Sequence, residues 1–294
     1  MTRRSIESES DEVLTAAVQP FSLRRKWQAV RPGYLFPLAF LLFWIVIIPF
    51  LPTERIPTPW KVFAFMWDEI RGDTVAPDSV YYNFGISLAR LAIGTVISMA
   101  LGIVVGVISG ISKLGEAFFR NYVVASLTMP GLIIALIAAL WFGFGFLTPV
   151  VTVVFGTFAY TATNIAEGVR ATPQDLIIMA KSFRFGRRKM LRHVILPALV
   201  PFLFVSLRYT LSLGWKALTI AEIFGASEGA GWMLRFWYDA NRLHSLLGYT
   251  FFFGIVTVVL DRVLFDFLAK RLLGWRGDVV TALKTSRAAT PGLQ

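Results

Sequence analysis

The chain has 294 residues, of which 56% are apolar and only 16% charged, and its mean hydropathy is +0.64. These values are typical of an integral membrane protein. The absence of cysteine excludes disulfides and thiolate metal sites, and two histidines leave little room for a histidine metal cluster. We therefore expect no metal and no cofactor on this chain.

Apolar runs long enough to cross a bilayer as helices follow one another along the sequence. A polar tail of mixed charge covers residues 1–33, and the first apolar run covers 34–52. Further runs cover 83–110, 120–140, 147–165, 198–222 and 246–269, with only a short turn near Gly110 between the second and third runs. The sequence predicts an all-α integral membrane protein with six transmembrane helices in a domain over 34–276 and a flexible tail over 277–294.

The basic residues indicate the orientation, because lysine and arginine in short loops remain on the cytoplasmic side. Twenty of the 29 lie in the first tail, the turn near Gly110, the loop over 166–197 or the end after residue 269. Both termini are therefore predicted to be cytoplasmic. This topology also accounts for the net charge of +11 without a nucleic acid partner.

Two further patterns concern packing rather than chemistry. Aromatic and apolar residues recur at helical spacing over 60–70, with charges between them, as expected for a helix lying in the membrane interface. Small residues recur every four positions at Ser98, Gly102, Gly106 and Gly110, which lets a second helix approach closely in lipid.

A basic, amphipathic segment over 172–197 separates the fourth and fifth apolar runs. Thr172 and Asp175 form a predicted capping box, with Pro173 at the first position of a helix over 173–185. Its apolar face is followed by a basic group: Arg184, Arg187, Arg188, Lys189 and Arg192. The helix is too short to span, so it is expected to protrude from the membrane or lie along it. Two interpretations stay open, a docking site for another protein and a basic loop bound to anionic lipid.

This segment resembles the cytoplasmic loop of inner-membrane permeases from binding-protein-dependent ABC importers. That loop motif runs Glu-Ala-Ala, three residues, Gly, nine residues, a branched aliphatic residue, one residue, then Leu-Pro. The ending matches over 194–197, including Leu196 and Pro197, and counting back aligns Ile178, Met179 and Ala180 with Glu-Ala-Ala and Arg184 with the Gly. Of these four aligned positions only Ala180 agrees, and Gly186 is the alternative residue for the turn.

Serial matches along residues 35–276 narrow the resemblance to the nitrate, sulfonate, taurine and bicarbonate group of these permeases. They are Ser87-Leu88-Ala89-Arg90, Met129-Pro130, Trp141-Phe142-Gly143-Phe144-Gly145, Asn164 with Gly168-Val169-Arg170, and segments over 221–226, 229–231, 261–262 and 270–276. The resemblance implies a permease dimer, expected to be a homodimer, in a bacterial inner membrane. It also implies cytoplasmic ABC ATPase subunits, which bind ATP, and an external solute-binding protein. The sequence lacks a G-x-x-x-x-G-K-[ST] phosphate loop, which agrees with ATP binding by another chain.

Polar and aromatic residues within the predicted spans are candidates for the pathway or its gate. Lys216 lies about two turns inside the outer end of the fifth span, where it either snorkels to the interface or faces an anion. Arg90 and Glu222 match family positions and are expected to pair or to pack at a gate. The remaining candidates are Trp141, Asn164 and Trp215.

Three classes of function are compatible with the composition. The resemblance favours a permease that imports a small solute, expected to be an anion. A secondary transporter or channel would favour inverted repeats or broken spans, and we find no convincing repeat. A membrane enzyme would need convergent catalytic groups, but His193 and His244 fall on opposite sides of the membrane in the predicted topology.

Overall fold

The computed structural model describes residues 35–50 and 57–261, and all regular structure in these ranges is helical. The chain divides into two units, residues 1–50 with 283–294 and residues 51–282. In the described part of the first unit, α3 (Leu35–Ile47) continues into the 3-10 turn η2 (Ile48–Phe50), and together they cover most of the first predicted span. The predicted tails over 1–33 and 277–294 lie outside the described residues.

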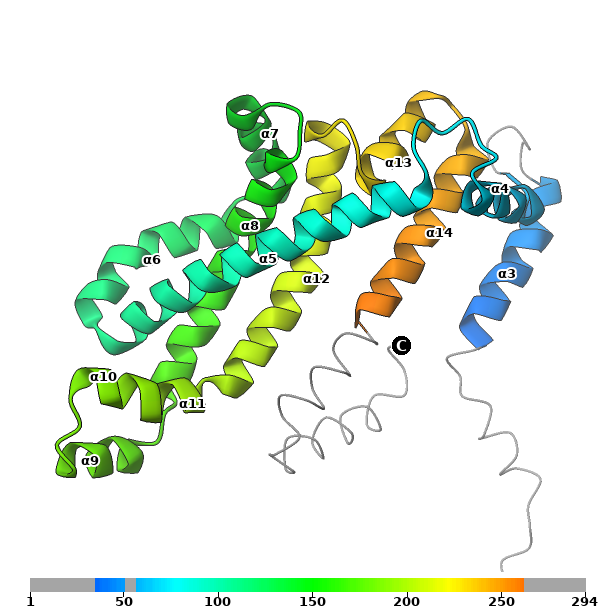
Figure 1. Ribbon diagram of the computed structural model, residues 1–294. Coiled ribbons are helices and arrows are strands. Elements are labelled where there is room, and N and C mark those ends of the chain that lie inside the picture. Colours follow the sequence, from blue (N-terminus) through cyan, green and yellow to red (C-terminus); the bar gives the residue numbers. More distant parts are fainter. Residues whose placement is uncertain (1–34, 51–56, 262–294) are drawn as a thin grey trace, which may run out of the picture. The chain divides into compact units, whose positions relative to one another are not determined.

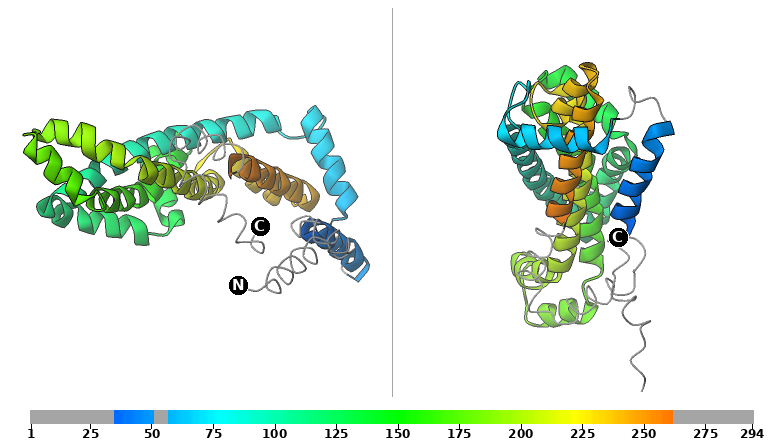
Figure 2. Two further views of the ribbon diagram at one scale, coloured as in Figure 1. Left: turned by 90° about the horizontal axis from the view of Figure 1, so that it is seen from below. Right: turned by 90° about the vertical axis from the view of Figure 1, so that its right-hand side faces the viewer.

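The second unit is built around α5, α8 and α12 (Figures 1 and 2). Helix α8 packs against both α5 and α12, while α13 and α4 adjoin α14. The helices are α4 (Pro59–Arg71), α5 (Val80–Ile111), α6 (Lys113–Thr128), α7 (Gly131–Phe142), α8 (Leu147–Arg170), α9 (Gln174–Ser182), α10 (Arg187–Met190), η3 (Leu191–Ile195), α11 (Leu196–Ala198), α12 (Val200–Gly225), α13 (Ala230–Asp239) and α14 (Leu243–Val259).

Two described helices, α5 and α8, are each long and apolar enough to cross a membrane. Two bent pairs meet the same length and composition requirements when each is taken together, α6 with α7 and the segment 187–198 with α12. The described part of this membrane protein is thus all-helical and contains two to four candidate spans. Helix α14 is apolar but has only 17 described residues, and the end of the sixth predicted span lies beyond residue 261.

The predicted continuous span over 120–140 is interrupted in the structure. Helices α6 and α7 meet at 102°, with Met129 in an extended conformation and Pro130 at the start of α7. Proline disfavours the helical conformation in the residue before it and has no N–H for the helix ladder. Pro130 therefore explains why one apolar run becomes two helices. The predicted turn near Gly110 is confirmed, because α5 ends at Ile111 and Ser112 caps α6.

The small-residue stripe is the contact surface of α5 with α8, as predicted. A Cβ atom on Gly102 would lie 2.4 Å from Thr161 Cβ, and one on Gly106 would lie 2.6 Å from the Ala162 carbonyl oxygen. Buried hydroxyl pairs lie beside these contacts, and Ser98 Oγ is 2.8 Å from the hydroxyl of Thr157. Close backbone approach and interhelical hydrogen bonds are the usual sources of helix association in lipid.

Helix α4 confirms the helix predicted over 60–70 and is amphipathic. It buries Val62, Phe65 and Glu69, and the Glu69 carboxylate accepts a hydrogen bond of 2.8 Å from the Tyr249 hydroxyl of α14. Trp60 and Trp67 on the opposite face are 63% and 56% exposed. One face of α4 is therefore held by the protein and the other carries exposed aromatic rings.

Candidate functional site

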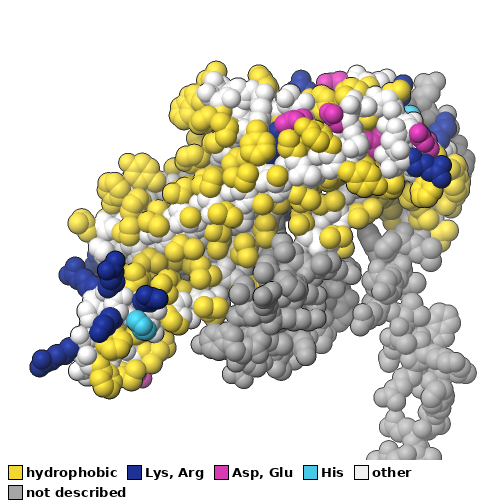
Figure 3. Space-filling model, in the orientation of Figure 1, with side chains coloured by type: hydrophobic (Ala, Val, Ile, Leu, Met, Phe, Trp, Pro, Cys, Tyr) yellow, Lys and Arg dark blue, Asp and Glu magenta, His cyan; other side chains and the backbone are white. Residues whose placement is uncertain are grey.

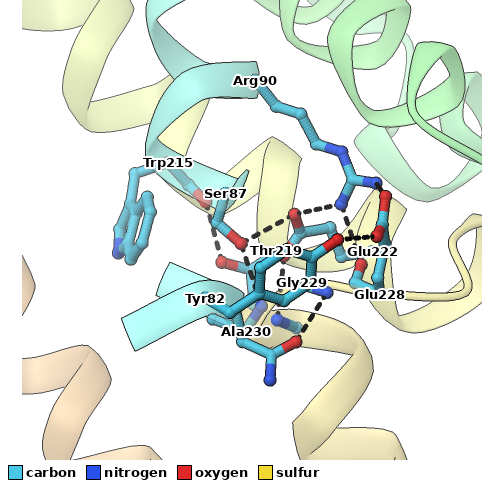
Figure 4. Close-up of polar contacts among 11 residues, drawn as sticks. Tyr82, Ser87, Arg90, Trp215, Thr219, Glu222, Glu228, Gly229 and Ala230 are labelled. Atoms are coloured by element: carbon cyan, nitrogen blue, oxygen red, sulfur yellow. Dashed lines mark hydrogen bonds and ion pairs between the residues drawn. The ribbon is translucent and has the colours of Figure 1, made fainter. Parts of the chain in front are cut away.

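The first candidate site is a buried polar cluster at the end of the second unit opposite α9 and α10 (Figure 1). Arg90 of α5 and Glu222 of α12 are completely buried, and their side chains form an ion pair of 2.9 Å (Figure 4). The guanidinium group also lies 5.2 Å from the centre of the Phe146 ring. The expected pairing of Arg90 with Glu222 is thus what the structure shows.

The turn between α12 and α13 completes this cluster. Arg90 donates to the backbone carbonyl of Glu228 at 2.8 Å and to its carboxylate at 3.1 Å. Glu222 accepts from the Ser87 hydroxyl at 2.8 Å and from the Gly231 N–H at 2.9 Å. The Ala230 N–H donates to Ser87 Oγ at 2.9 Å. Side chains from α5 and α12 therefore hold the start of α13 in place.

Gly229 has a conformation that this turn requires. Its φ of +111° is rarely adopted by residues with a side chain. A Cβ atom there would lie 2.5 Å from Glu222 Oε1 and 2.8 Å from an Arg90 nitrogen. Its N–H donates to Asn83 Oδ1 at 3.0 Å. Glycine thus lets the backbone approach the ion pair closely.

The cluster fastens helices to one another and is not arranged to bind a ligand. The charges of Arg90 and Glu222 are compensated, and the second carboxylate, of Glu228, also accepts from the Tyr82 hydroxyl at 2.7 Å. A buried charge is stable only when it is paired and hydrogen-bonded, and removing one partner of a buried pair is strongly destabilising. The network therefore connects α5, α12 and α13, and its one cation is paired with two carboxylates.

Of the three other pathway candidates, two form hydrogen bonds between helices and one is exposed. Asn164 joins α8 to α12, because its amide donates to the Phe202 carbonyl at 2.9 Å and to Ser206 Oγ at 2.8 Å. Trp215 is buried and donates to Thr257 Oγ1 of α14 at 3.0 Å. Trp141 on α7 is 75% exposed. The structure thus brings Arg90 and Glu222 together, but not with these three residues.

Lys216 is exposed on α12, and no other described residue forms a hydrogen bond or ion pair with it. Sequence reasoning did not identify Asn83 and Glu228 as site residues. Asn83 could have been found from its spacing, since it lies one turn before Ser87 and two turns before Arg90 on the same face of an apolar helix. Among the described residues, no group of three histidine or acidic side chains is placed to hold a metal ion.

The second candidate site is the coupling segment, which we define as residues 172–197. Helix α9 forms within it, but the capping-box prediction is wrong. The Thr172 hydroxyl donates back to the Gly168 carbonyl at 3.3 Å, Pro173 is the N-cap, and no side chain caps the helix. Thr172 is buried at the end of α8, so its hydroxyl is used by the preceding helix. Asp175 lies in the first turn of α9, where a negative charge suits the helix dipole.

Arg184, at the position of the family glycine, itself makes the turn after α9. Its φ is +54°, its N–H donates to the Lys181 carbonyl at 2.8 Å, and the Phe185 N–H donates to the Ala180 carbonyl at 3.0 Å. These two bonds form a Schellman motif, which usually has glycine at the left-handed position. Gly186 has φ −66° and precedes α10, so it does not supply this turn.

The coupling segment exposes both apolar and basic side chains. Ala180 is the buried residue of α9, whereas Ile178 is 59%, Met179 51% and Phe183 71% exposed. Lysine and arginine side chains gather at the end of the molecule that carries α9 and α10 (Figure 3). The exposed basic residues there are Lys181 of α9 and, after it, Arg184, Arg187, Arg188, Lys189 and Arg192.

The segment continues directly into α12. The chain passes from α10 through the π-helical turn η3 and through α11, which contains Leu196 and Pro197, and then bends by 61° into α12. In a regular helix the Pro197 ring would clash with the carbonyl of residue 193, and a π turn relieves that contact. Ile195 and Leu199 are buried against α8 residues Ile165 and Val169.

Comparison with known proteins places these features in one family. Residues 98–273 match the model of the binding-protein-dependent transport system inner membrane component. The nitrate import permease protein NrtB of Synechococcus elongatus is 26% identical over 82% of this chain and 86% of its own length. The bicarbonate transport system permease protein CmpB of the same organism is 29% identical over 81% of this chain and 89% of its own length.

A solved structure supports the fold. The crystal structure of an amino acid ABC transporter with histidines is similar with a TM-score of 0.54 and 17% sequence identity, over 65% of this chain and 92% of that chain. The resemblance noted in the sequence is confirmed by the family match, which covers more than half of the chain. The chain belongs to the family of binding-protein-dependent transport system inner membrane components, and it is the membrane-embedded permease subunit of an ABC importer.

Proposed function

We propose that this permease imports a small anion, works as a homodimer with two cytoplasmic ABC ATPase subunits, and receives its solute from an external binding protein. The observation that carries the proposal is the coupling segment. It presents a short amphipathic helix, exposed on its apolar side and followed by five exposed basic residues, next to a membrane-embedded helix bundle. Exposed apolar side chains of this kind are more stable in contact with a protein partner than in contact with water.

Helix α9 buries only Ala180, so its other apolar side chains do not contribute to the core of the protein. Exposed Ile178, Met179 and Phe183 would be unfavourable in water, since exposed apolar patches of this kind usually mark an interaction site. The basic residues after α9 would form ion pairs with acidic groups at the rim of a groove on the partner protein. We infer that Thr172 to Arg192 occupies a groove of the ATPase.

The covalent path from α9 to α12 gives the docking a mechanical consequence. Movement of α9 is passed through α10, η3 and α11 to α12, which packs on α8 and is fastened to α5 and α13 by the Arg90 cluster. Closure of the ATPases would therefore shift α12 together with its neighbours. Rigid-body motion of packed helices is one established way to alternate access.

The proposed topology has six spans with both termini in the cytoplasm of a bacterial cell, and the chain lies in the inner membrane. This assignment rests on the distribution of lysine and arginine and places α9 inside and the Arg90 cluster toward the outside. ATP is bound by the partner subunit, and the permease itself carries no cofactor. The anion proposal rests on the solutes in the names of the relatives, nitrate and bicarbonate.

Affinity purification in detergent tests the docking. The ATPase should be recovered with the wild-type chain and lost when Arg184, Arg187 and Arg188 are changed to Glu. The matched control changes Lys113 and Arg120 of α6 to Glu, because both are exposed basic residues near the same end of α5 and α8 but lie outside α9 and α10. Loss of the ATPase in both variants would indicate a general charge effect. Binding of the wild type to anionic lipid alone, with no ATPase recovered and uptake by the protein alone in liposomes, would refute the proposal in favour of a secondary transporter.

A further inference from the structure

Helix α12 has an open face that differs in character from the rest of the bundle. The exposed residues between positions 205 and 224 are Val205, Arg208, Tyr209, Ser212, Lys216 and Phe224. Arg208 is paired with Asp261 of the last described turn at 3.1 Å. Tyr209, Ser212 and Lys216 follow at intervals of three and four, so they lie above one another on one side of the helix. Lys216 is thus one member of a polar row.

The open face of α5 provides an internal comparison. Its exposed residues over the same length of helix are all apolar: Ala92, Ile93, Val96, Ile97, Ala100, Leu101, Val104 and Ile108. This composition suits contact with lipid chains. The row on α12, which contains a hydroxyl, a phenol and an ammonium group, does not suit contact with lipid chains. The two helices of one bundle therefore face different surroundings.

Lys216 lies deep along the spanning helices. The next residue, Ala217, has its Cβ 3.7 Å from the position that a Cβ on Gly156 would occupy. Gly156 is nine residues from the start of α8 at Leu147, or roughly 14 Å along the helix at 1.5 Å per residue. An ammonium group at that depth is unfavourable in hydrocarbon, and no described carboxylate pairs with it.

We propose that the Tyr209–Ser212–Lys216 face of α12 lines the water-filled solute pathway and that Lys216, with the two hydroxyl groups as hydrogen-bond donors, selects small anions. The inference rests on the proposed import of an anion and adds the residues that recognise it. The positive charge remains solvated in an aqueous pathway, and an ammonium group and hydroxyls are all donors to the oxygens of an oxyanion.

The other charged candidates, and two of the three uncharged ones, are engaged with other residues, while Trp141 is exposed but carries no charge. Arg90 is paired with both Glu222 and Glu228, and Trp215 is buried against α14. Asn164 uses its amide donors to join α8 to α12. Of the six pathway candidates expected from the sequence, Lys216 therefore has its charge available for a solute.

Thiol accessibility tests this assignment without knowledge of the solute, because the natural chain has no cysteine. Ser212→Cys is compared with Val104→Cys, which lies on the apolar face of α5 and is 57% exposed. Each full-length variant, assembled with its ATPase in right-side-out and inside-out membranes, is treated with the anionic reagent sulfonatoethyl methanethiosulfonate or its cationic trimethylammonioethyl counterpart. Rates are corrected for the reaction of each reagent with free cysteine.

Ser212→Cys should react from at least one side, and Val104→Cys should not. The anionic reagent should react faster, and changing Lys216 to Met in the Ser212→Cys variant should lower the anion-to-cation rate ratio about tenfold, since a unit charge one helical turn away acts oppositely on the two reagents. Lys216→Arg should keep the ratio. This second variant separates the charge from any effect of Met on folding.

Two results would overturn the proposal. If Ser212→Cys is as unreactive as Val104→Cys from both sides, the α12 face does not line an aqueous pathway. If it reacts with a ratio that does not depend on Lys216, the lysine does not select anions. Either result with the ATPase still copurifying would leave the proposed importer assembly standing, whereas loss of the ATPase from the wild type would contradict the assembly itself.

Discussion

The contact between α5 and α8 gives the most direct prediction for stability. In the variant Gly102→Ala the new Cβ would meet Thr161 Cβ at 2.4 Å, Thr161 Cγ2 at 2.6 Å and the Phe158 carbonyl oxygen at 2.9 Å. Moving Thr161 aside would disturb its hydroxyl contact of 3.0 Å with Thr210 of α12. Neither helix backbone can relax freely, so we expect the overpacked contact to lower the free energy of unfolding by about 1–3 kcal/mol.

Gly85→Ala is the matched control, because Gly85 lies on the same helix with no atom within 4 Å of the added Cβ. Both substitutions gain the same helix propensity of about 1 kcal/mol, so their difference isolates the clash. The midpoint of thermal unfolding in detergent should be roughly 2–12 °C lower for Gly102→Ala than for Gly85→Ala. Equal midpoints would refute the contact of α5 with α8 at Gly102.

Three further outcomes are expected. Arg184→Gly should stabilise the protein by about 0.5–1 kcal/mol, because φ is +54° there and glycine adopts this conformation without steric strain; a lower thermal midpoint would contradict this account of the turn. Glu222→Gln should cost about 3 kcal/mol, since it removes one partner of a buried ion pair, while Arg235→Gln in the exposed pair with Asp239 should cost less than about 1 kcal/mol; similar losses in chemical denaturation would show that burial is not the cause. Gly229→Ala should cost about 3 kcal/mol and increase protease cleavage between α12 and α13, because both its φ and its space exclude a side chain; unchanged cleavage would argue against the tight turn.

Local patterns were sufficient for the long apolar helices, for α4 and α9, and for one helix contact. The four-residue spacing of Ser98, Gly102, Gly106 and Gly110 predicts close packing because the period places these residues on one side of a helix, and no other information is needed. Pairing was one of the two roles expected for Arg90 and Glu222, and the structure shows an ion pair between them. Apolar length alone did not reveal the break at Met129, where the local effect of Pro130 overrides hydropathy.

Groups that meet from distant parts of the chain required the tertiary structure. Glu228 and Asn83 are 145 positions apart in sequence and acquire their roles only because α12 and α13 return to the start of α5. The capping box at Thr172 failed for a related reason, because the hydroxyl bonds to the helix on its other side.

Composition, period and spacing are properties of the chain alone, and they were enough to predict the membrane class, the long apolar helices, the basic segment over 172–197 and the family resemblance. Which polar groups are bonded within the protein and which stay exposed became clear from the packing of the helices. Arg90 and Lys216 are both cations within apolar helices, yet one is enclosed by two carboxylates and the other lies exposed on α12. The difference depends on which helices pack around each residue, and a linear pattern does not contain that information.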